Sequence, residues 1–159
     1  MKTTMKSIIY LFIVLGLTTC KSVKLDQTPP FTTTEATYNY WTGGQQGVSG
    51  IRVIMNYKDA AEGVSFQKIY FQNKEGEIET YKREGKTFLI GHINTSTPRE
   101  QDLTLDFDPN KELNNKPPKE EKIPFVLKEN EAVIVYTYKG ESHHFKVKNI
   151  KKTKSDFFP

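Results

Sequence analysis

Several residue types are scarce in this chain of 159 residues, which has one cysteine (Cys20), one tryptophan and three histidines. A single cysteine excludes an intrachain disulfide, so a stable fold must depend on the packing of apolar side chains. Aromatic residues make up 12% of the chain, which is enough for a core, and the length after residue 19 is typical of one domain. We therefore expect a single domain with a packed core.

The signatures of common catalytic sites are also missing. No serine stands in a Gly-x-Ser-x-Gly turn, and the stretch Gly47-Val48-Ser49-Gly50 lacks that spacing. The same stretch has no Gly-Lys-Ser/Thr, so it is not a phosphate loop. His143 and His144 are adjacent, and neighbours on a strand point to opposite faces, so they do not predict a metal pair. We expect no metal, no cofactor and no catalytic residue that the sequence can name.

One segment comes close to a calcium loop. Asp106, Asp108 and Asn110 place side-chain oxygens at every second position. The match then fails, because Lys111 stands where the loop needs glycine and Pro117 stands where a bidentate glutamate belongs. Outward-facing carboxylates on a half-buried strand explain the same residues without a metal.

The first twenty residues have the layout of an export signal. Lys2 and Lys6 supply positive charge, an apolar run extends from Ile8 to Leu17, and a short polar stretch ends at Cys20. The apolar run is much shorter than the ~20 residues that a membrane-spanning helix needs. We therefore expect residues 1–19 to be a signal peptide that is removed. The net charge of +4 includes Lys2 and Lys6, and export argues against a nucleic-acid partner.

The stretch Leu17-Thr18-Thr19-Cys20 resembles the lipobox of bacterial lipoproteins of the Bacteroidota type. The resemblance implies that Cys20 becomes the first mature residue and carries acyl chains such as palmitate. It further implies a protein of the bacterial cell envelope, anchored in the lipid bilayer of the outer membrane. Surface-export signals place acids after the cysteine, whereas Lys21-Ser22-Val23-Lys24 follows here, which favours the periplasmic side. The alternative is an ordinary secretory signal with an incidental cysteine.

Beyond the signal, the dominant pattern is the period-two alternation of strands separated by turn residues. Residues 20–33 include Pro29-Pro30 and predict a flexible tether, 34–153 a single domain, and 154–159 a tail that ends in Phe157-Phe158-Pro159. Two aromatic residues in the tail favour its docking on the protein itself over docking on a partner. We expect turns at 73–76, 83–85 and 139–140, and a long surface loop over 109–122. The predicted strands cover 51–57, 64–71, 77–82, 87–93, 103–107, 123–127, 132–138 and 143–150.

These strands predict an all-β fold. About eight or nine short strands at this spacing favour an antiparallel β-sandwich that is immunoglobulin-like, and a β-barrel is the alternative. No segment after the signal shows a helical period, and no internal repeat is visible.

The most unusual segment runs from Tyr38 to Gly50, where three aromatic residues precede a glycine-rich stretch. Glycine lets a backbone approach a ligand closely, and exposed Tyr or Trp rings bind sugar rings or peptide side chains. The other interpretation is structural, with Trp41 in the core and the glycines in a wide connection. The candidate ligand or partner surface consists of Tyr38, Tyr40, Trp41, Gly43, Gly44, Gln45 and Gln46.

The sequence thus predicts a membrane-anchored, non-catalytic binding or structural module of the cell envelope. Its partner would be an envelope protein or a glycan. Two alternatives stay open. One is an envelope hydrolase or sugar-processing enzyme that uses carboxylates, since any fold with nineteen acids could pair two of them. The other is an inhibitor or immunity lipoprotein.

Overall fold

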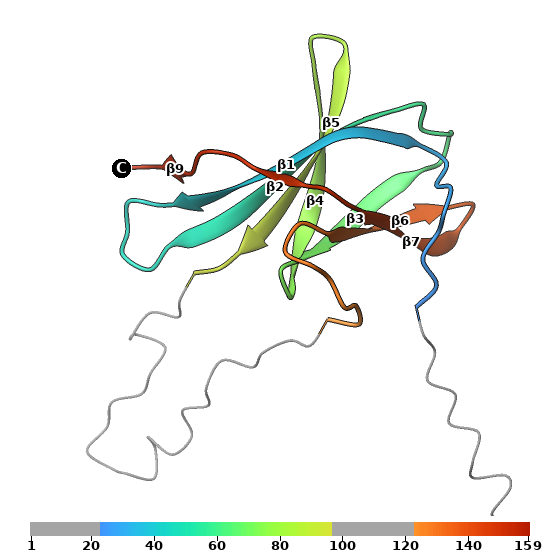
Figure 1. The fold of residues 1–159 in the computed structure, drawn as a ribbon. Helices are drawn as coiled ribbons and strands as arrows, with labels where there is room; N and C mark the ends of the chain where they lie inside the picture. The colour runs from blue at the N-terminus through green and yellow to red at the C-terminus, as the bar shows by residue number, and fades with distance from the viewer. Residues whose placement is uncertain (1–22, 97–122) are drawn as a thin grey trace, which may run out of the picture.

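The computed structural model describes residues 23–96 and 123–159, and these residues form nine strands and no helix (Figure 1). Cys20, the signal peptide, the predicted strand 103–107, the calcium-like segment and the loop 109–122 lie outside the described residues. The strands are β1 (Thr32–Thr42), β2 (Ser49–Lys58), β3 (Ser65–Phe71), β4 (Lys74–Arg83), β5 (Lys86–Asn94), β6 (Ala132–Tyr138), β7 (Glu141–Val147), β8 (Lys151–Lys152) and β9 (Asp156–Phe157).

All nine strands belong to one sheet: eight follow the order β7-β6-β3-β4-β5-β2-β1-β8, and β9 pairs with β1 outside this path. The pairs from β7 to β1 are antiparallel, while β8 and β9 both pair parallel with β1. The prediction of an all-β, mainly antiparallel fold with eight or nine strands is confirmed.

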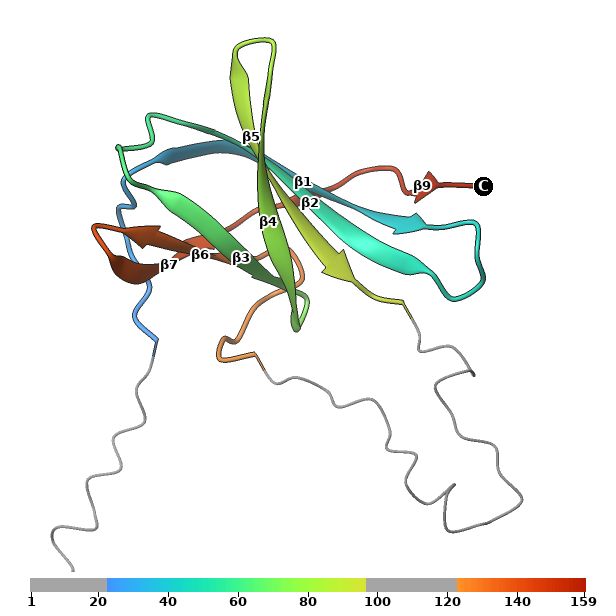
Figure 2. The ribbon, with the colours of Figure 1, turned by 180° about the vertical axis from the view of Figure 1, so that it is seen from behind.

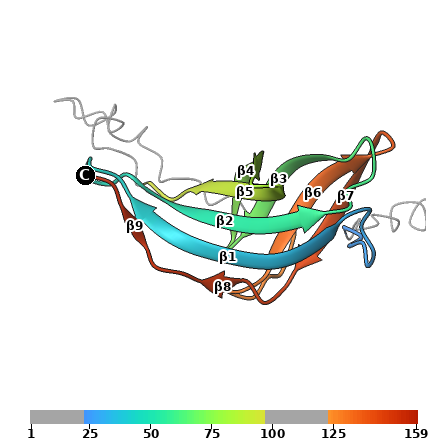
Figure 3. The ribbon, with the colours of Figure 1, turned by 90° about the horizontal axis from the view of Figure 1, so that it is seen from above.

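The sheet is strongly curved (Figure 3). One half, formed by β7, β6 and β3, packs against the other half, formed by β5, β2, β1 and β8, like the layers of a sandwich. Three strands separate β1 from β3 in the sheet order, yet the rings of Tyr38 and Phe71 lie 4.9 Å apart. The core between the halves is contributed by six strands and the segment after β7. Its buried members are Tyr38, Ile51, Val53, Met55, Ile69, Phe71, Leu89, Ile93, Ala132, Ile134, Val147 and Ile150.

Strand β4 connects the two halves. Its first residues, Lys74 to Glu77, pair with β3, and from Glu77 to Arg83 it pairs with β5. Gly76 lies near this crossing, where a Cβ atom would overlap the carbonyl oxygen of His92 on β5. A residue with a side chain would push the two strands apart, so glycine permits the close approach.

Three two-residue turns connect successive antiparallel strands. The turn at Lys139-Gly140 is where the sequence predicts it, with φ values of 51° and 81°. The turn expected at 73–76 is displaced, because Phe71 pairs with Lys74 and the turn consists of Gln72 and Asn73, with φ values of 48° and 59°. Residues 74–76 are part of β4. Positive φ at both turn positions is typical of type I′ hairpins, and here two non-glycine residues adopt it.

The tether predicted for 20–33 is wrong for its second half. Phe31 is a core residue, only 5% exposed, and its ring packs edge-on against those of Phe66, Tyr136 and Phe145. Asp26 forms a bridge with β7 through its backbone N–H, which donates to the carbonyl oxygen of His144 at 2.7 Å. The domain therefore begins before residue 34. The sequence conceals this because one phenylalanine among prolines and threonines carries no periodic signal.

Two other boundaries differ from the prediction. Residues 123–127 are not a strand, but the Phe125 ring packs against Tyr70 and His144 and covers the outer face of the sheet there. The tail predicted at 154–159 includes β9, whose pairing with β1 extends the sheet. Phe158 docks on the protein itself, with its ring 6.4 Å from that of Trp41, whereas the Phe157 side chain is largely exposed.

Candidate functional site

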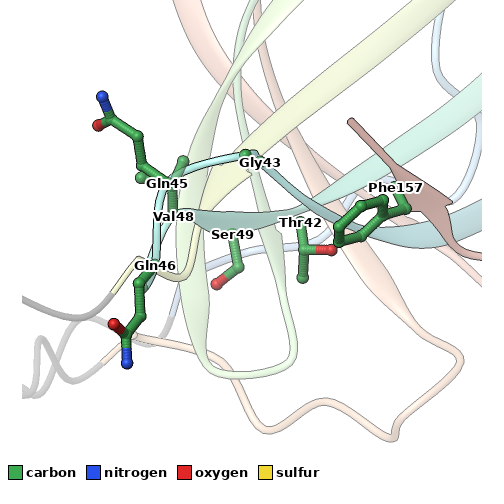
Figure 4. Close-up of a pocket in the computed structure, with 9 residues that line it drawn as sticks. Thr42, Gly43, Gln45, Gln46, Val48, Ser49 and Phe157 are labelled. Atoms are coloured by element: carbon green, nitrogen blue, oxygen red, sulfur yellow. The ribbon is translucent and has the colours of Figure 1, made fainter. Parts of the chain in front are cut away.

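A hollow of about 570 Å³ lies at the end of the sheet where β1 turns into β2 (Figure 4). Its lining combines hydroxyl groups, side-chain amides, glycine backbone and one aromatic ring. The lining residues are Thr42, Gly43, Gly44, Gln45, Gln46, Gly47, Val48, Ser49 and Phe157.

The connection between β1 and β2 is held by its own hydrogen bonds. The Gly43 N–H donates to the Val48 carbonyl at 2.9 Å, and the Val48 N–H donates to the Gln45 carbonyl at 3.2 Å. Gly47 has a φ of 82°, which favours glycine at the return of the loop. Gln45 and Gln46 extend outward from the tip of the loop in Figure 4. The loop thus holds two amide side chains on a constrained backbone.

The base of the loop is fixed to the end of β5. The Ser49 hydroxyl lies 2.9 Å from the Thr95 hydroxyl, and the Ser96 hydroxyl both accepts from the Ser49 N–H and donates to the Ser49 carbonyl, each at 3.1 Å. Because these groups are partly buried, their hydrogen bonds restrict the motion of the loop base.

The C-terminal tail forms the other wall of the hollow. Asp156 accepts a hydrogen bond from the amide of buried Asn39 at 2.7 Å and lies 3.3 Å from a guanidinium nitrogen of Arg52. The Phe158 N–H donates to the Thr42 carbonyl at 2.9 Å. These contacts hold Phe157 beside Thr42, where its side chain is 76% exposed and available to a ligand.

The predicted surface residues separate into two groups. Gly43, Gly44, Gln45 and Gln46 do line the hollow, and the three aromatic residues before them do not. Phe157 was not among the predicted residues, although the aromatic tail that contains it was noted. Only the pairing of β9 with β1 brings the end of the chain to this loop.

The three aromatic residues have structural roles. Tyr38 is buried in the core, and burial raises the pKa of its phenol. The Tyr40 hydroxyl donates to Gln72 at 2.9 Å, and the ammonium group of Lys152 lies 4.8 Å from the centre of its ring. The Trp41 indole covers Gly50, where a Cβ atom would collide with the ring. Tyr38 is thus a core residue, whereas Trp41 is half-buried outside the core cluster, and the glycine-rich part remains the candidate surface.

A second polar cluster joins the N-terminal segment to β6 and β7. One carboxylate oxygen of Asp26 accepts from the Tyr136 hydroxyl at 2.6 Å and lies 3.1 Å from Nδ1 of His143. The imidazole stacks on the Tyr136 ring with 5.2 Å between centroids. Burial, together with the hydrogen bond to Asp26, strongly raises the pKa of Tyr136. A neutral phenol that donates to a carboxylate is an attachment point, and the cluster pins the N-terminal segment to the sheet.

His144 lies on the other face of β7, as strand alternation predicts. It is half-buried against Phe125 rather than fully solvated, and this desolvation lowers its pKa. Among the residues that the structure describes, no three histidine, cysteine or acidic side chains are grouped so that they could hold a metal ion.

Comparisons with known proteins found no matching family model, no matching curated protein and no matching solved structure. Over residues 23–96 and 123–159, the structure contains no helix suited to crossing a membrane.

Proposed function

We propose that this protein is a lipid-anchored, non-catalytic binding module of the bacterial cell envelope. Its ligand, a glycan or an extended segment of an envelope protein, binds at the hollow between the β1–β2 loop and Phe157. The observation that carries this proposal is the composition of that hollow, whose lining combines two glutamine side chains, the hydroxyl groups of Thr42 and Ser49 and an exposed aromatic ring.

This lining suits polar, ring-containing ligands. Amides and hydroxyls both donate and accept hydrogen bonds, so they match sugar hydroxyls or a peptide backbone. An exposed phenylalanine ring packs on the apolar face of a sugar or on an apolar side chain. The lining includes no carboxylate, so the acid pair of a hydrolase is not part of this hollow.

The docking of Asp26 limits how far the body stands from the bilayer. If Cys20 carries the lipid, only the segment from Cys20 to Asp26 is available as a tether, because Asp26 is bonded to β6 and β7. Fully extended, that segment reaches no more than about 20 Å. The body is therefore held close to the membrane. The end that carries Asp26 is the one nearest the membrane, and the β1–β2 loop lies at the opposite end (Figure 1).

Anchoring is tested by comparing the native chain with Cys20→Ser after expression in a Bacteroidota host. We expect the native protein in the membrane fraction with an acyl mass increment on Cys20, and the variant in the soluble envelope fraction. Membrane association of both forms without any acyl group would refute the anchor.

Binding is tested by site-specific photo-cross-linking in intact cells, with the photoreactive residue at position 46 or, as a matched control, at position 126. Val126 is 95% exposed and is not among the residues that line the hollow. We expect a discrete adduct from position 46 that Phe157→Ala weakens, and none from position 126. Equal adducts at both positions, or none at 46, would contradict the proposal.

A further inference from the structure

The β4–β5 hairpin projects beyond the rest of the sheet (Figures 1 and 2). From Ile78 onward β4 pairs only with β5, because β3 pairs with β4 no further than Glu77. Residues 79–83 are all exposed, and Tyr81 presents 46% of its surface to solvent, with its ring 6.0 Å from that of Phe88. Two-stranded ribbons of this kind are marginally stable alone in water.

The turns reveal which backbone groups of β4 face its outer edge. Residues that flank a two-residue hairpin turn form a hydrogen-bonded pair, and such pairs alternate along antiparallel strands. Arg83 and Lys86 flank the second turn, so Arg83, Tyr81 and Glu79 bond to β5. It follows that Ile78, Thr80 and Lys82 direct their N–H and C=O groups outward.

The first turn leads to the same assignment independently. Lys74 pairs with Phe71 across the Gln72-Asn73 turn, so the even-numbered residues of β4 bond toward β3. Beyond Glu77, where β3 diverges, that edge continues as the open groups of Ile78, Thr80 and Lys82. No strand within the described ranges pairs with this edge. Open edges of this kind are templates for pairing with another strand.

The charges along the edge are self-complementary. Since β3 occupies the edge up to Glu77, a second copy can pair only from Ile78 onward. An antiparallel copy related by a two-fold axis at Tyr81 then fills the available length. This register places Arg83 opposite Glu79 of the second copy, in both directions, and pairs Thr80 with Lys82 through their open backbone groups. Opposite charges directly across a strand pair are stabilising.

We propose that the outer edge of β4, from Ile78 to Arg83, is a self-association surface for a second copy of this chain. The copies pair antiparallel about Tyr81, whose rings meet at the two-fold axis and extend the aromatic contact with Phe88 across both ribbons. A C2 interface of this type is self-complementary by construction. It is small, so the association is weak and depends on concentration.

The proposal is tested by sedimentation velocity on the chain from residue 20 with Cys20→Ser, which keeps every residue that the structure describes. From about 10 μM to about 1 mM, the range for a small interface, we expect a shift from monomer to dimer. Thr80→Pro removes an outward N–H without touching the bonds to β5, and should weaken the dimer at least about tenfold. Thr80→Val keeps the N–H and should retain it. A monomer throughout, or a dimer unaffected by Thr80→Pro, would overturn the proposal.

A charge exchange tests the register. Arg83→Glu places two acids opposite each other at both symmetry-related positions and should weaken the dimer, and adding Glu79→Lys should restore it. Adding Glu77→Lys instead should not, because Glu77 lies opposite Lys68 of β3 and outside the edge that is open to a second copy. If Glu77→Lys restored the dimer of the Arg83→Glu variant and Glu79→Lys did not, the two-fold axis at Tyr81 would be contradicted. Circular dichroism of each variant confirms that the fold is retained.

Discussion

Strands β6 and β4 pair with the two sides of β3, yet their surroundings are opposite. In β6 the five residues from Ala132 to Tyr136 are all buried, both edges are paired, and both faces are covered. In β4 most residues are exposed and half of one edge is open. Strand β6 lies at the centre of the core, and β4 extends the sheet into solvent.

Hydrogen-bonded pairing and burial are therefore separate contributions to this fold. Every residue of both strands pairs with at least one neighbouring strand. Strand β6 fully buries large apolar side chains, whereas β4 contributes only the partly buried Ile78 to the core. Burial of apolar area is the dominant favourable term in folding, at roughly 25 cal/mol per Å². We therefore expect the stability of the fold to depend on β6, and substitutions in β4 to change it little except where its backbone meets β5.

The largest expected effect is at the centre of β6. Ile134 is completely buried, and Ile134→Ala should lower the free energy of unfolding by about 2–5 kcal/mol, because it removes buried methyl groups and leaves a cavity. Urea denaturation measures the change. Glu79→Ala on exposed β4 is the matched control, with an expected change within about 0.5 kcal/mol. Equal losses from the two substitutions would remove the distinction between the strands.

Gly76 is the exception within β4. Gly76→Ala should destabilise the protein by about 1–3 kcal/mol, because the new methyl group would press on the His92 carbonyl. Thermal unfolding measures the loss, with exposed Glu75→Ala as the control. If both variants unfold alike, the approach of β4 to β5 is less close than the structure indicates.

An effect of similar size is expected where β6 holds the N-terminal segment. Tyr136→Phe keeps the ring but deletes the hydrogen bond to Asp26, and should cost about 1–3 kcal/mol. Amide hydrogen exchange should become faster at Asp26, whose N–H bonds to β7, and stay unchanged in β4. Unchanged exchange at Asp26 would show that Phe31 alone anchors the segment.

The smallest expected effect is on the pH dependence of the stability, and it comes from His144 on β7. Desolvation lowers the pKa of His144, so the unfolded chain takes up a proton at higher pH than the folded one. Stability should therefore fall as the pH drops below about 6.5, the ordinary value for histidine. His144→Gln should flatten the stability curve between pH 7 and 5, as measured by denaturation at each pH. A curve of unchanged slope would place the acid sensitivity elsewhere.

A further loss is expected at lower pH from Glu131, beside β6. Hydrogen bonds from the Lys128 N–H and the Lys146 ammonium group lower its pKa, so the stability that it contributes disappears as its carboxylate is protonated. Glu131→Gln should remove this second decline but leave the one caused by His144.

Local pattern was enough to predict much of the fold. Alternation in β2, β3, β5 and β6 identified these strands, and Lys139-Gly140 identified a turn, because both signals lie within a few residues. The turn at Gln72-Asn73 lies about two residues before the predicted turn, because the sequence pattern favours Gly76 as the turn glycine. Glycine is needed at position 76 because the carbonyl of His92 lies so close to it, and His92 belongs to a strand that the sequence alone does not place beside β4.

For the candidate site, sequence composition pointed to the glycine-rich loop but not to its boundaries. Gln45 and Gln46 line the hollow as predicted, while Tyr38 turned inward because the curvature of the sheet places it against Phe71. The contribution of Phe157 depends on parallel pairing with a strand more than a hundred residues earlier. No periodic signal in the sequence carries such a contact.

Local sequence patterns alone were enough to predict that the chain is all-β and that it cannot form an intrachain disulfide, while the export signal over residues 1–19 stays a prediction. Alternation and charge are patterns of a few neighbouring residues, and the cysteine count is read directly from the composition. Only the tertiary structure decided that the sheet curves onto itself, that Asp26 and Phe31 belong to the body, and that both walls of the hollow meet. Those outcomes depend on contacts between distant segments, whose free energy depends on the packing of the whole sheet.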